Sequence, residues 1–255
     1  MKQSKKKSHH ILAIDIGGTG LKASVIGPDG KMLVERVRIE TPYPCKPNIL
    51  VDALEKLVKP LPKFDYVSVG FPGVVRDGKV LTAPHYGNKI WRDFNLVGAL
   101  EKRFCRPVRL INDAEMQGLA AIRGSGLELV VTLGTGVGTA LFRQGRLTPH
   151  LELAHHPIHH RKTYNDYLGD KAFKKIGKKK WNHRVRRMLV ILHSLLNYDW
   201  IYLGGGNSRN ISFKLDTNMK LISNNDGIVG GFALWQPEWD WSSGKKTPSR
   251  RATSK

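Results

Sequence analysis

The 255-residue sequence has few cysteines and no long apolar segment. Its two cysteines, Cys45 and Cys105, form no CxxC pair and no metal-ligand spacing, so we expect free thiols in a reducing compartment. No apolar run approaches the ~18 residues of a membrane span, and the run ILAI near the basic N-terminus ends at Asp15 instead of continuing as a signal core. These absences predict a cytoplasmic protein without a membrane segment.

Acidic residues are also scarce. There are 42 Lys and Arg against 21 Asp and Glu, a formal net charge of +21, which favours a polyanionic partner. The excess gathers at both ends and in residues 171–187, which hold nine Lys and Arg, no acid and interleaved apolar residues. Residues 1–10 and 236–255 lack apolar periodicity, so we expect disordered tails there.

What the sequence does contain is an alternation of strand-like and helix-like segments, which is typical of an α/β fold. The expected strands are 11–16, 21–27, 31–39, 65–71, 108–112, 128–134, 137–142 and 199–206. The expected helices are 47–59, 95–104, 114–122, a region around 164–176, a longer helix near 181–198, and 226–235. Because the first half and the second half have a similar order of elements, we predict two related lobes.

Three glycine-rich turns follow expected strands: DIGGTGLK (15–22), LGTGVG (133–138) and GGGN (204–207). Glycine lets backbone amides converge on phosphate oxygens without side-chain bulk. In the first turn, Thr19 adds a hydroxyl and Lys22 an ammonium. Neither of the first two matches a P-loop or a complete GxGxxG, and a tight hairpin is the alternative for either one alone. Together they favour a phosphate site.

Carboxylates accompany these turns. Asp15 could hold magnesium, directly or through a water molecule. INDAE (111–115) places Asn112 and Asp113 where a strand ends before a helix, the usual ligand position in α/β folds. Asp113 could take a proton from an alcohol during phosphoryl transfer, or it could simply cap the helix. Glu115 is expected to face solvent or a lysine.

Histidines cluster in HLELAHHPIHH (150–160). A metal site would use His155, His156, His159 and His160. Their spacing fits no defined zinc signature, so we favour a polar segment facing a sugar over a bound metal.

The ordered set of motifs resembles the ROK family of sugar kinases, over roughly residues 11 to 235. The motifs are DIGGTGLK, GFPGVV, INDAE, LGTGVG, ELAH and YLGGGN. The match is most similar to the polyphosphate glucokinase branch. The resemblance implies an α/β, two-lobed actin/hexokinase-like (ribonuclease H-like) fold with a central cleft. It implies one lobe of 11–113 plus 226–235 and a second of 114–225.

The resemblance also implies a reaction: phosphoryl transfer from polyphosphate, and from ATP as a further donor, to the 6-hydroxyl of glucose, with Mg²⁺, in a homodimer. Asp113 would be the catalytic base. The sugar ligands would be Asn112, Glu152, His155, His85 and Asn88. The phosphate-binding residues would be Asp15, Gly17, Gly18, Thr19, Gly20, Lys22, Gly134, Thr135, Gly136 and Gly138. Gly204, Gly205 and Gly206 would lie beneath a donor nucleotide.

The sequence departs from the family at three places. Ala154 stands where the ExGH clamp has glycine, and His85 stands where an APN motif has asparagine, so Asn88 is a candidate substitute. The family's CxCGxxGCxE motif is missing, so no structural zinc is expected.

The basic segment 171–187 is predicted to bind polyphosphate. Lys171, Lys174, Lys175 and Lys178 recur at spacings of three and four, which would align them on one helical face. The track would continue through Lys179, Lys180, Arg184 and Arg187. The alternatives are a solvated basic helix and a nucleic-acid groove in which Trp181 stacks on bases.

Other functions stay open at this point. One is an ATP-dependent ROK kinase of glucose, mannose or an N-acetylhexosamine. A second is a ROK-like transcriptional regulator or nucleic-acid binder, although such regulators carry a helix-turn-helix module where only ten residues precede the first strand here. A third is a sugar-binding pseudoenzyme, against which Asp113 argues.

Overall fold

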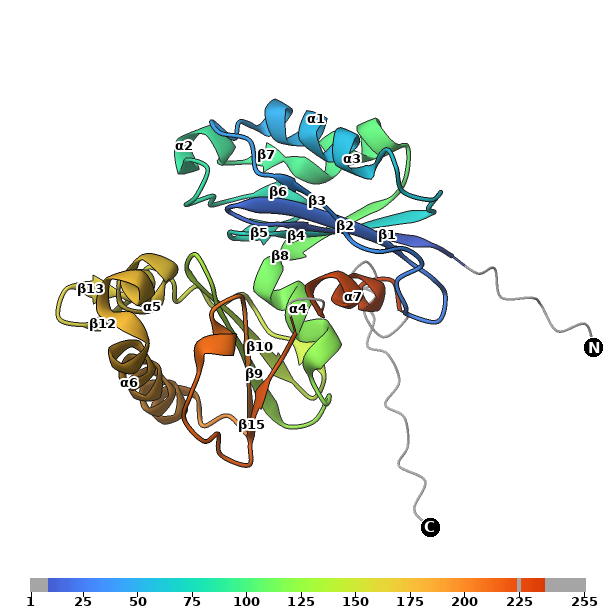
Figure 1. The fold of residues 1–255 in the computed structure, drawn as a ribbon. Helices are drawn as coiled ribbons and strands as arrows, with labels where there is room; N and C mark the ends of the chain where they lie inside the picture. Colours follow the sequence, from blue (N-terminus) through green and yellow to red (C-terminus); the bar gives the residue numbers. More distant parts are fainter. Residues whose placement is uncertain (1–8, 224–225, 237–255) are drawn as a thin grey trace, which may run out of the picture.

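The computed structural model describes residues 9–223 and 226–236. They form two five-stranded sheets with helices around them, as Figure 1 shows, besides two smaller sheets of two and three short strands. The strands of the first sheet are β1 (Ile11–Ile16), β2 (Gly20–Ile26), β3 (Val37–Glu40), β4 (Tyr66–Phe71) and β8 (Val108–Asn112), in the order β3-β2-β1-β4-β8. Those of the second are β9 (Leu127–Leu133), β10 (Val137–Arg143), β11 (Arg146–Leu147), β14 (Trp200–Gly204) and β15 (Met219–Leu221), in the order β11-β10-β9-β14-β15. Each sheet pairs an antiparallel hairpin, β1–β2 or β9–β10, with further parallel strands.

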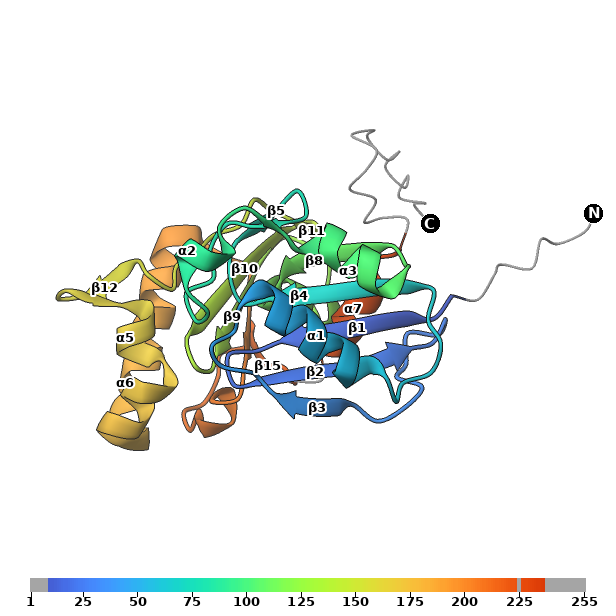
Figure 2. The same ribbon diagram turned by 90° about the horizontal axis from the view of Figure 1, so that it is seen from above.

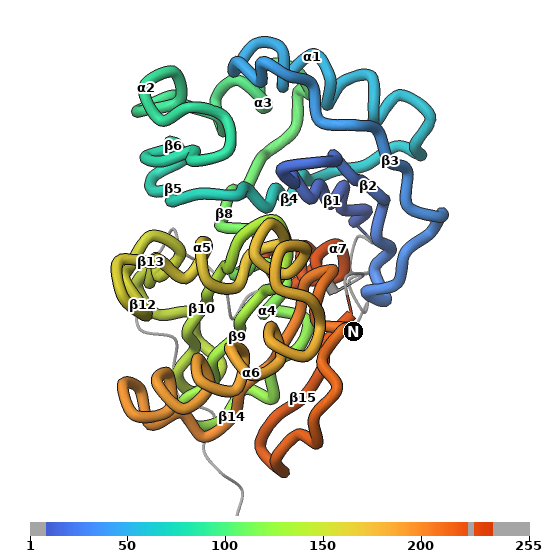
Figure 3. The backbone as a smooth tube through the Cα atoms, turned by 60° about the vertical axis from the view of Figure 1, so that its left-hand side comes forward, coloured from blue at the N-terminus to red at the C-terminus, as the bar shows by residue number. Residues whose placement is uncertain are grey.

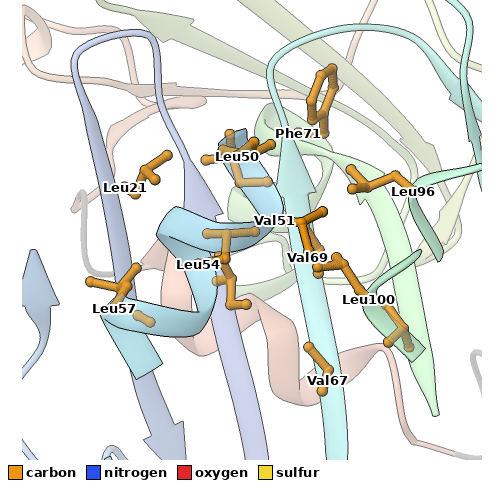
Figure 4. Packing of buried hydrophobic residues seen from close by; sticks show 14 of the residues in the cluster. Leu21, Leu50, Val51, Leu54, Leu57, Val67, Val69, Phe71, Leu96 and Leu100 are labelled. Atoms are coloured by element: carbon orange, nitrogen blue, oxygen red, sulfur yellow. The ribbon is translucent and has the colours of Figure 1, made fainter. Parts of the chain in front are cut away.

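Two helices cover one face of the first sheet, α1 (Pro47–Val58) and α3 (Leu96–Phe104), as the view from above shows (Figure 2). Leu50, Leu54 and Leu57 recur at helical spacing on α1 and are fully buried or nearly so. They face strand residues such as Val67 and Val69 (Figure 4). This apolar layer supports the strands whose ends carry the predicted site.

The opposite face of the first sheet packs against α4 (Asp113–Ala121) and α7 (Asp226–Ala233). A Cβ at Gly230 would collide with the carbonyl oxygen of Met116, so α7 and α4 touch backbone to backbone. A Cβ at Gly231 would lie 2.8 Å from that of Ala13 in β1. Helix α7 therefore returns to strand β1, as the tube in Figure 3 shows. The exact lobe boundaries stay a prediction, and residues 1–8, 224–225 and 237–255 lie outside the described ranges.

The second sheet lies between α4 on one face and α6 (Asp170–Leu196) on the other, with α5 (Tyr164–Leu168) just before α6. Trp181, Val185 and Leu192 of α6 are fully buried against β9. The expected division into a helical region around 164–176 and a longer helix near 181–198 is confirmed, because a break at Gly177 (φ 76°, ψ 166°) divides α6 into two helices. The second helix begins directly after Gly177, a few residues earlier than expected. None of the described helices is both long and apolar enough to cross a membrane.

Several short elements were not expected from the sequence. They are β5 (Val75–Arg76), β6 (Lys79–Val80), β7 (Phe94–Asn95), α2 (Asn88–Trp91), β12 (Pro157–His159), β13 (Lys162–Thr163) and the 3₁₀ helix Ser208–Asn210. The strand expected over 31–39 is also wrong. Only Val37–Glu40 pairs with β2 as a strand, and Met32 makes an isolated bridge to Ile26. The intervening Val34 instead accepts a hydrogen bond from the Ser24 hydroxyl.

Candidate active site

A cavity of about 520 Å³ lies where the strands of both sheets end. All three glycine turns reach it: β1–β2, β9–β10 and the segment after β14. The predicted site residues that line it are Asp15, Gly17, Gly18, Thr19, Gly20, Lys22, His85, Asn112, Asp113, Gly134, Thr135, Gly136, Gly138, Glu152, Lys174, Gly205 and Gly206. Gly204 ends β14 beside the cavity, with its Cα facing the side chain of Gln117. The structure thus brings together residues that are far apart in sequence.

Side-chain hydroxyls hold the first glycine turn. Thr41 Oγ1 donates to the Gly17 carbonyl at 2.6 Å, and Tyr86 Oη donates to the same oxygen at 2.9 Å. Tyr43 Oη donates to the Gly18 carbonyl at 2.5 Å. Sequence reasoning missed all three hydroxyls, which come from loops with no glycine-turn pattern of their own. They fix the turn before any ligand binds.

The second turn is built by close backbone approach. Val137 N donates to Asn165 Oδ1 at 2.7 Å, and a Cβ at Gly136 would lie 2.6 Å from that same oxygen. In the same way, a Cβ at Gly138 would lie 2.6 Å from Thr132 Oγ1, and this hydroxyl accepts a hydrogen bond from Gly138 N at 3.2 Å. Glycine is needed at both positions because a side chain would displace a hydrogen-bond partner.

Asn112, rather than Asp113, caps α4. Its side-chain oxygen accepts from the amides of Ala114 and Glu115, and its amide group donates to the Gly73 carbonyl at 3.1 Å. The capping alternative for Asp113 is therefore wrong. Because both polar atoms of Asn112 are engaged within the protein, its predicted role as a sugar ligand gains no support from this geometry.

Asp113 is the first residue of α4 and lines the cavity with its carboxylate. Burial, together with the negative charge of Asp15, raises the pKa of Asp113 to about 7. Its Oδ1 accepts a hydrogen bond from Ala114 N at 2.8 Å. A carboxylate with this pKa can accept and release a proton near neutral pH, as a general base requires.

Glu152 also lines the cavity and is held by two partners. Its Oε1 accepts from Ala154 N at 3.0 Å, and its Oε2 lies 3.5 Å from His150 Nε2. Burial alone would raise the pKa of Glu152, but the hydrogen bonds from His150 and from Ala154 N lower it. Glu152 is therefore an ionised acceptor for hydroxyl groups. Ala154 stands where the ExGH motif has glycine, and its backbone amide still donates the hydrogen bond to Glu152.

His150 and Glu115 were not predicted to belong to the site. His150 Nδ1 lies 2.7 Å from Glu115 Oε1, and Glu115 Oε2 accepts from Asn112 N at 3.0 Å. The expectation that Glu115 faces solvent or a lysine is wrong, because this side chain is buried and completes a capping box.

The remaining predicted sugar ligands divide into three cases. His85 lines the cavity, and burial and the neighbouring His155 lower its pKa. His155 is exposed and does not line the cavity, although its charge acts on Glu152. Asn88 begins α2 outside the cavity and accepts a hydrogen bond from Ala83 N at 2.7 Å, so its predicted role in place of an asparagine at the sugar gains no support from this geometry.

The basic segment is interrupted rather than continuous. The break at Gly177 separates Lys171, Lys174 and Lys175 from Lys178, so the expectation of a single helical face is wrong. Lys174 lines the cavity and lies 2.7 Å from Asp170. The exposed members that do not line it are Lys171, Lys175, Lys178, Lys179, Lys180 and Arg187.

Two members of this segment serve the fold. Arg184 donates to the Tyr167 carbonyl at 3.0 Å and lies over the Tyr167 ring, so its place in a polyphosphate track gains no support. Trp181 is fully buried and donates to the Leu168 carbonyl at 2.8 Å. The stacking role for Trp181 in a nucleic-acid groove is therefore wrong. Arg209, which sequence reasoning missed, lines the cavity beside the third glycine turn.

The histidine cluster does not form a metal centre within the described ranges. No group of three or more His, Cys, Asp and Glu side chains there could hold a metal ion. His159 packs edge-on against Tyr167, and His156 and His160 are exposed.

Comparison with known proteins supplies the family. The ROK family model matches residues 11–155. A polyphosphate glucokinase of Mycobacterium tuberculosis (strain CDC 1551 / Oshkosh) is 28% identical over 234 residues, which cover 86% of this chain and 84% of that protein. An N-acetylmannosamine kinase of Escherichia coli O139:H28 (strain E24377A / ETEC) is 38% identical over 141 residues, which cover 53% of this chain and 48% of that protein.

Solved structures agree with this assignment. The inorganic polyphosphate/ATP-glucomannokinase from Arthrobacter sp. strain KM superposes with a TM-score of 0.80 at 30% identity, covering 89% of this chain and 97% of that one. A ROK family glucokinase from Streptomyces griseus, in complex with glucose and AMPPNP, gives a TM-score of 0.71 at 19% identity, covering 87% and 97%, and shows the fold alone. The predicted actin/hexokinase-like α/β fold is confirmed.

Proposed function

Because this chain belongs to the ROK family, we propose that it is a sugar kinase that transfers a phosphoryl group from polyphosphate to the 6-hydroxyl of glucose, with ATP as a second donor. One observation carries the proposal: the Asp113 carboxylate, with a pKa raised to about 7, lines one cavity together with three glycine turns. A base among phosphate-binding turns suits phosphoryl transfer to an alcohol.

Each wall of the cavity has its own task. Glu152 accepts hydrogen bonds from sugar hydroxyls, with His85 at the same wall. Ionised Asp113 takes the proton of the attacking hydroxyl. The amides of the turns around Gly18 and Thr135 bind the oxygens of the transferring phosphoryl group. The hydroxyls of Thr41, Tyr43 and Tyr86 hold the first of these turns in place.

The carboxylates present suit magnesium. Asp15 and Asp113 line the same cavity, and the charge of Asp15 raises the pKa of Asp113, so a divalent cation between sugar and donor would offset this repulsion. Carboxylate, phosphate and water oxygens are the ligands that Mg²⁺ prefers. Asp15 would hold the ion, directly or through water. When bound, the ion neutralises negative charge on the transferring phosphates.

The charge distribution supports polyphosphate as donor. Lys174 and Arg209 line the cavity, and the lysines of α6 continue outward over an exposed surface. A linear polyanion offers a charge on every unit to such a surface, whereas a nucleotide ends after three phosphates. The similarity to an N-acetylmannosamine kinase favours, as second candidate, a kinase of an N-acetylhexosamine. The homodimer stays a prediction.

A coupled assay of the purified protein tests the function. Glucose, mannose and N-acetylmannosamine are each offered with ATP and with long-chain polyphosphate, in magnesium. We expect glucose with polyphosphate to give the highest kcat/KM. Phosphorylation of glucose by ATP alone would leave an ATP-dependent kinase, preference for N-acetylmannosamine would favour the second candidate, and no product with any pair would reject the proposal.

A charge-reversal variant tests the donor surface. It changes to Glu four exposed lysines that do not line the cavity: Lys175, Lys178, Lys179 and Lys180. The matched control changes to Glu four exposed lysines of the first lobe: Lys56, Lys59, Lys63 and Lys102. We expect the first variant alone to raise the KM for polyphosphate far more than that for ATP, with wild-type affinity falling steeply with salt through counterion release. The polyphosphate surface would be contradicted if both variants raised the KM for polyphosphate equally. It would also be contradicted if the first variant changed the KM for polyphosphate and the KM for ATP equally.

A further inference from the structure

His150 lies between two carboxylates, one on each side of its ring. Its Nδ1 is 2.7 Å from Glu115 Oε1, and its Nε2 is 3.5 Å from Glu152 Oε2. The side chains are largely withdrawn from water, with exposed fractions of 14% for His150, 7% for Glu115 and 29% for Glu152. This arrangement joins a residue of the cavity wall to a residue of α4.

The donor chemistry of imidazole fixes the charge of His150. A neutral ring has one N–H donor, whereas an imidazolium has two, and ionised carboxylates only accept. Both carboxylates can therefore be satisfied only by a protonated ring. Burial alone would lower the pKa of His150, but the hydrogen bonds to Glu115 and Glu152 raise it to about 9. The other titratable groups nearby interact with Glu152. Its charge acts to raise the pKa of Asp113 and of His85, and His155 acts to lower the pKa of Glu152.

The two carboxylates belong to different working parts of the site. Glu115 accepts from Asn112 N at 3.0 Å and so fixes the start of α4, where Asp113 sits. Glu152 lines the cavity. A group that holds both carboxylates sets the distance between the proposed base and the proposed sugar ligand.

We propose that His150, as an imidazolium, is a positioning residue that couples Glu152 to the α4 segment carrying Asp113, so that sugar affinity depends on the charge of His150. The inference rests on the proposed sugar kinase function and adds to it a residue that does not line the cavity itself. Loss of the ring's charge removes the donor to one of the two carboxylates. If that bond is the one to Glu152, only Ala154 N still holds Glu152, which can then turn away from the sugar.

Sugar affinity as a function of pH tests this coupling. The dissociation constant for glucose is measured by calorimetry from pH 7 to 10 without donor. We expect wild-type affinity to fall as pH rises through about 9. His150→Gln should bind glucose about 10- to 100-fold more weakly at pH 7.5, as loss of a charge-assisted hydrogen bond predicts, and should lack the fall.

Two further variants separate positioning from mere structure. Glu115→Gln removes one of the two carboxylates, so the fall in affinity should move to lower pH. His156→Gln changes an exposed histidine of the same segment and should follow the wild type. An NMR titration of the His150 ring in the wild-type protein reads its charge directly, even if His150→Gln does not fold.

The outcomes are distinguishable. A neutral His150 ring at pH 7.5 overturns the inference, and so does an unchanged pH profile in both His150→Gln and Glu115→Gln. A wild-type protein that binds neither glucose nor mannose nor N-acetylmannosamine at any pH overturns the proposed function, and the coupling inferred from it is overturned as well. Wild-type binding with the expected shift in Glu115→Gln supports both.

Discussion

The carboxylates of Asp15 and Asp113 line the same cavity, and the charge of Asp15 adds to burial in raising the pKa of Asp113 to about 7. Asp15 lies near the end of β1 and Asp113 directly follows β8, with β4 between these parallel strands. Gly70 of β4 makes room here, since a Cβ would lie 3.3 Å from the Cα of Asp113. Asp15 also forms an ion pair with Lys22, whose Nζ lies 2.8 Å from Asp15 Oδ2, so the same cavity holds two carboxylates and one ammonium group.

Replacement of Asp113 by Asn should remove the base while keeping its size. We expect turnover to fall by about 10²–10⁴-fold, the usual range for loss of a general base, with sugar affinity little changed. Steady-state rates and glucose calorimetry measure the two effects. Turnover close to wild type in Asp113→Asn would exclude the role. In the wild type, kcat/KM should rise with pH through about 7 as Asp113 ionises.

The same substitution should stabilise the protein at alkaline pH. The pKa of Asp113 is higher in the folded protein, about 7, than in the unfolded chain. Its contribution to stability is therefore complete below about pH 4 and is lost as pH rises through 7. Asp113→Asn should raise the free energy of unfolding at pH 8 by on the order of 2 kcal/mol, and much less at pH 5. Urea titrations measure this, with the exposed Asp93→Asn as control.

The two members of the ELAH clamp should differ. Glu152 lines the cavity, so Glu152→Gln should weaken glucose binding by about 1–3 kcal/mol, since hydroxyl donors lose an ionised acceptor. His155 is exposed, so His155→Ala should weaken it less. Calorimetry compares them. A larger loss in His155→Ala would show that His155 turns into the cavity when sugar binds.

The third glycine turn offers a matched pair of variants. Gly205 has φ +82°, and a Cβ there would collide with the backbone of Leu133, whereas nothing lies within 4 Å of a Cβ at Gly206. Gly205→Ala should therefore lower the free energy of unfolding by about 1–3 kcal/mol, and Gly206→Ala by less than about 0.5 kcal/mol. Denaturant titrations check both, and equal losses would mean that the turn relaxes freely.

Segments with a strong local pattern could be predicted from the sequence. The apolar run at 11–16 and the strand at 108–112 have the expected bounds, and α1 begins at Pro47 as its periodicity indicates. The segment 31–39 was wrongly predicted as one strand because its apolar residues suggest a strand. In the structure the Val34 carbonyl accepts a hydrogen bond from the Ser24 side chain instead of a bond of the strand ladder. The break at Gly177, where φ is positive, falls between the two helical segments expected from the sequence, whereas the division at Gly169 between α5 and α6 was not expected.

The site was predictable where backbone chemistry alone defines it. The second and third glycine turns follow the parallel strands β9 and β14, whose ends share one edge of the second sheet, so their proximity could be predicted from the sequence. The first turn follows β1 of the other sheet and meets them only across the cavity of the folded protein. The link from Glu115 to His150 did not, since the two are 35 positions apart and an acid on a helix is usually exposed. The hydroxyls of Tyr43 and Tyr86 were missed for the same reason, because only the folded chain brings them to Gly17 and Gly18.

The return of α7 to the first sheet has a consequence for biosynthesis. Strands β1 and β4 are synthesised before α7, yet Ala13 and Ser68 lie against Gly231 of that helix, and Ser68 also accepts a hydrogen bond from Trp235. Until α7 has been synthesised, the nascent chain therefore presents one uncovered face of a formed sheet, which is a surface that chaperones recognise and that aggregates. Premature termination before α7 should yield insoluble protein rather than a stable half-molecule.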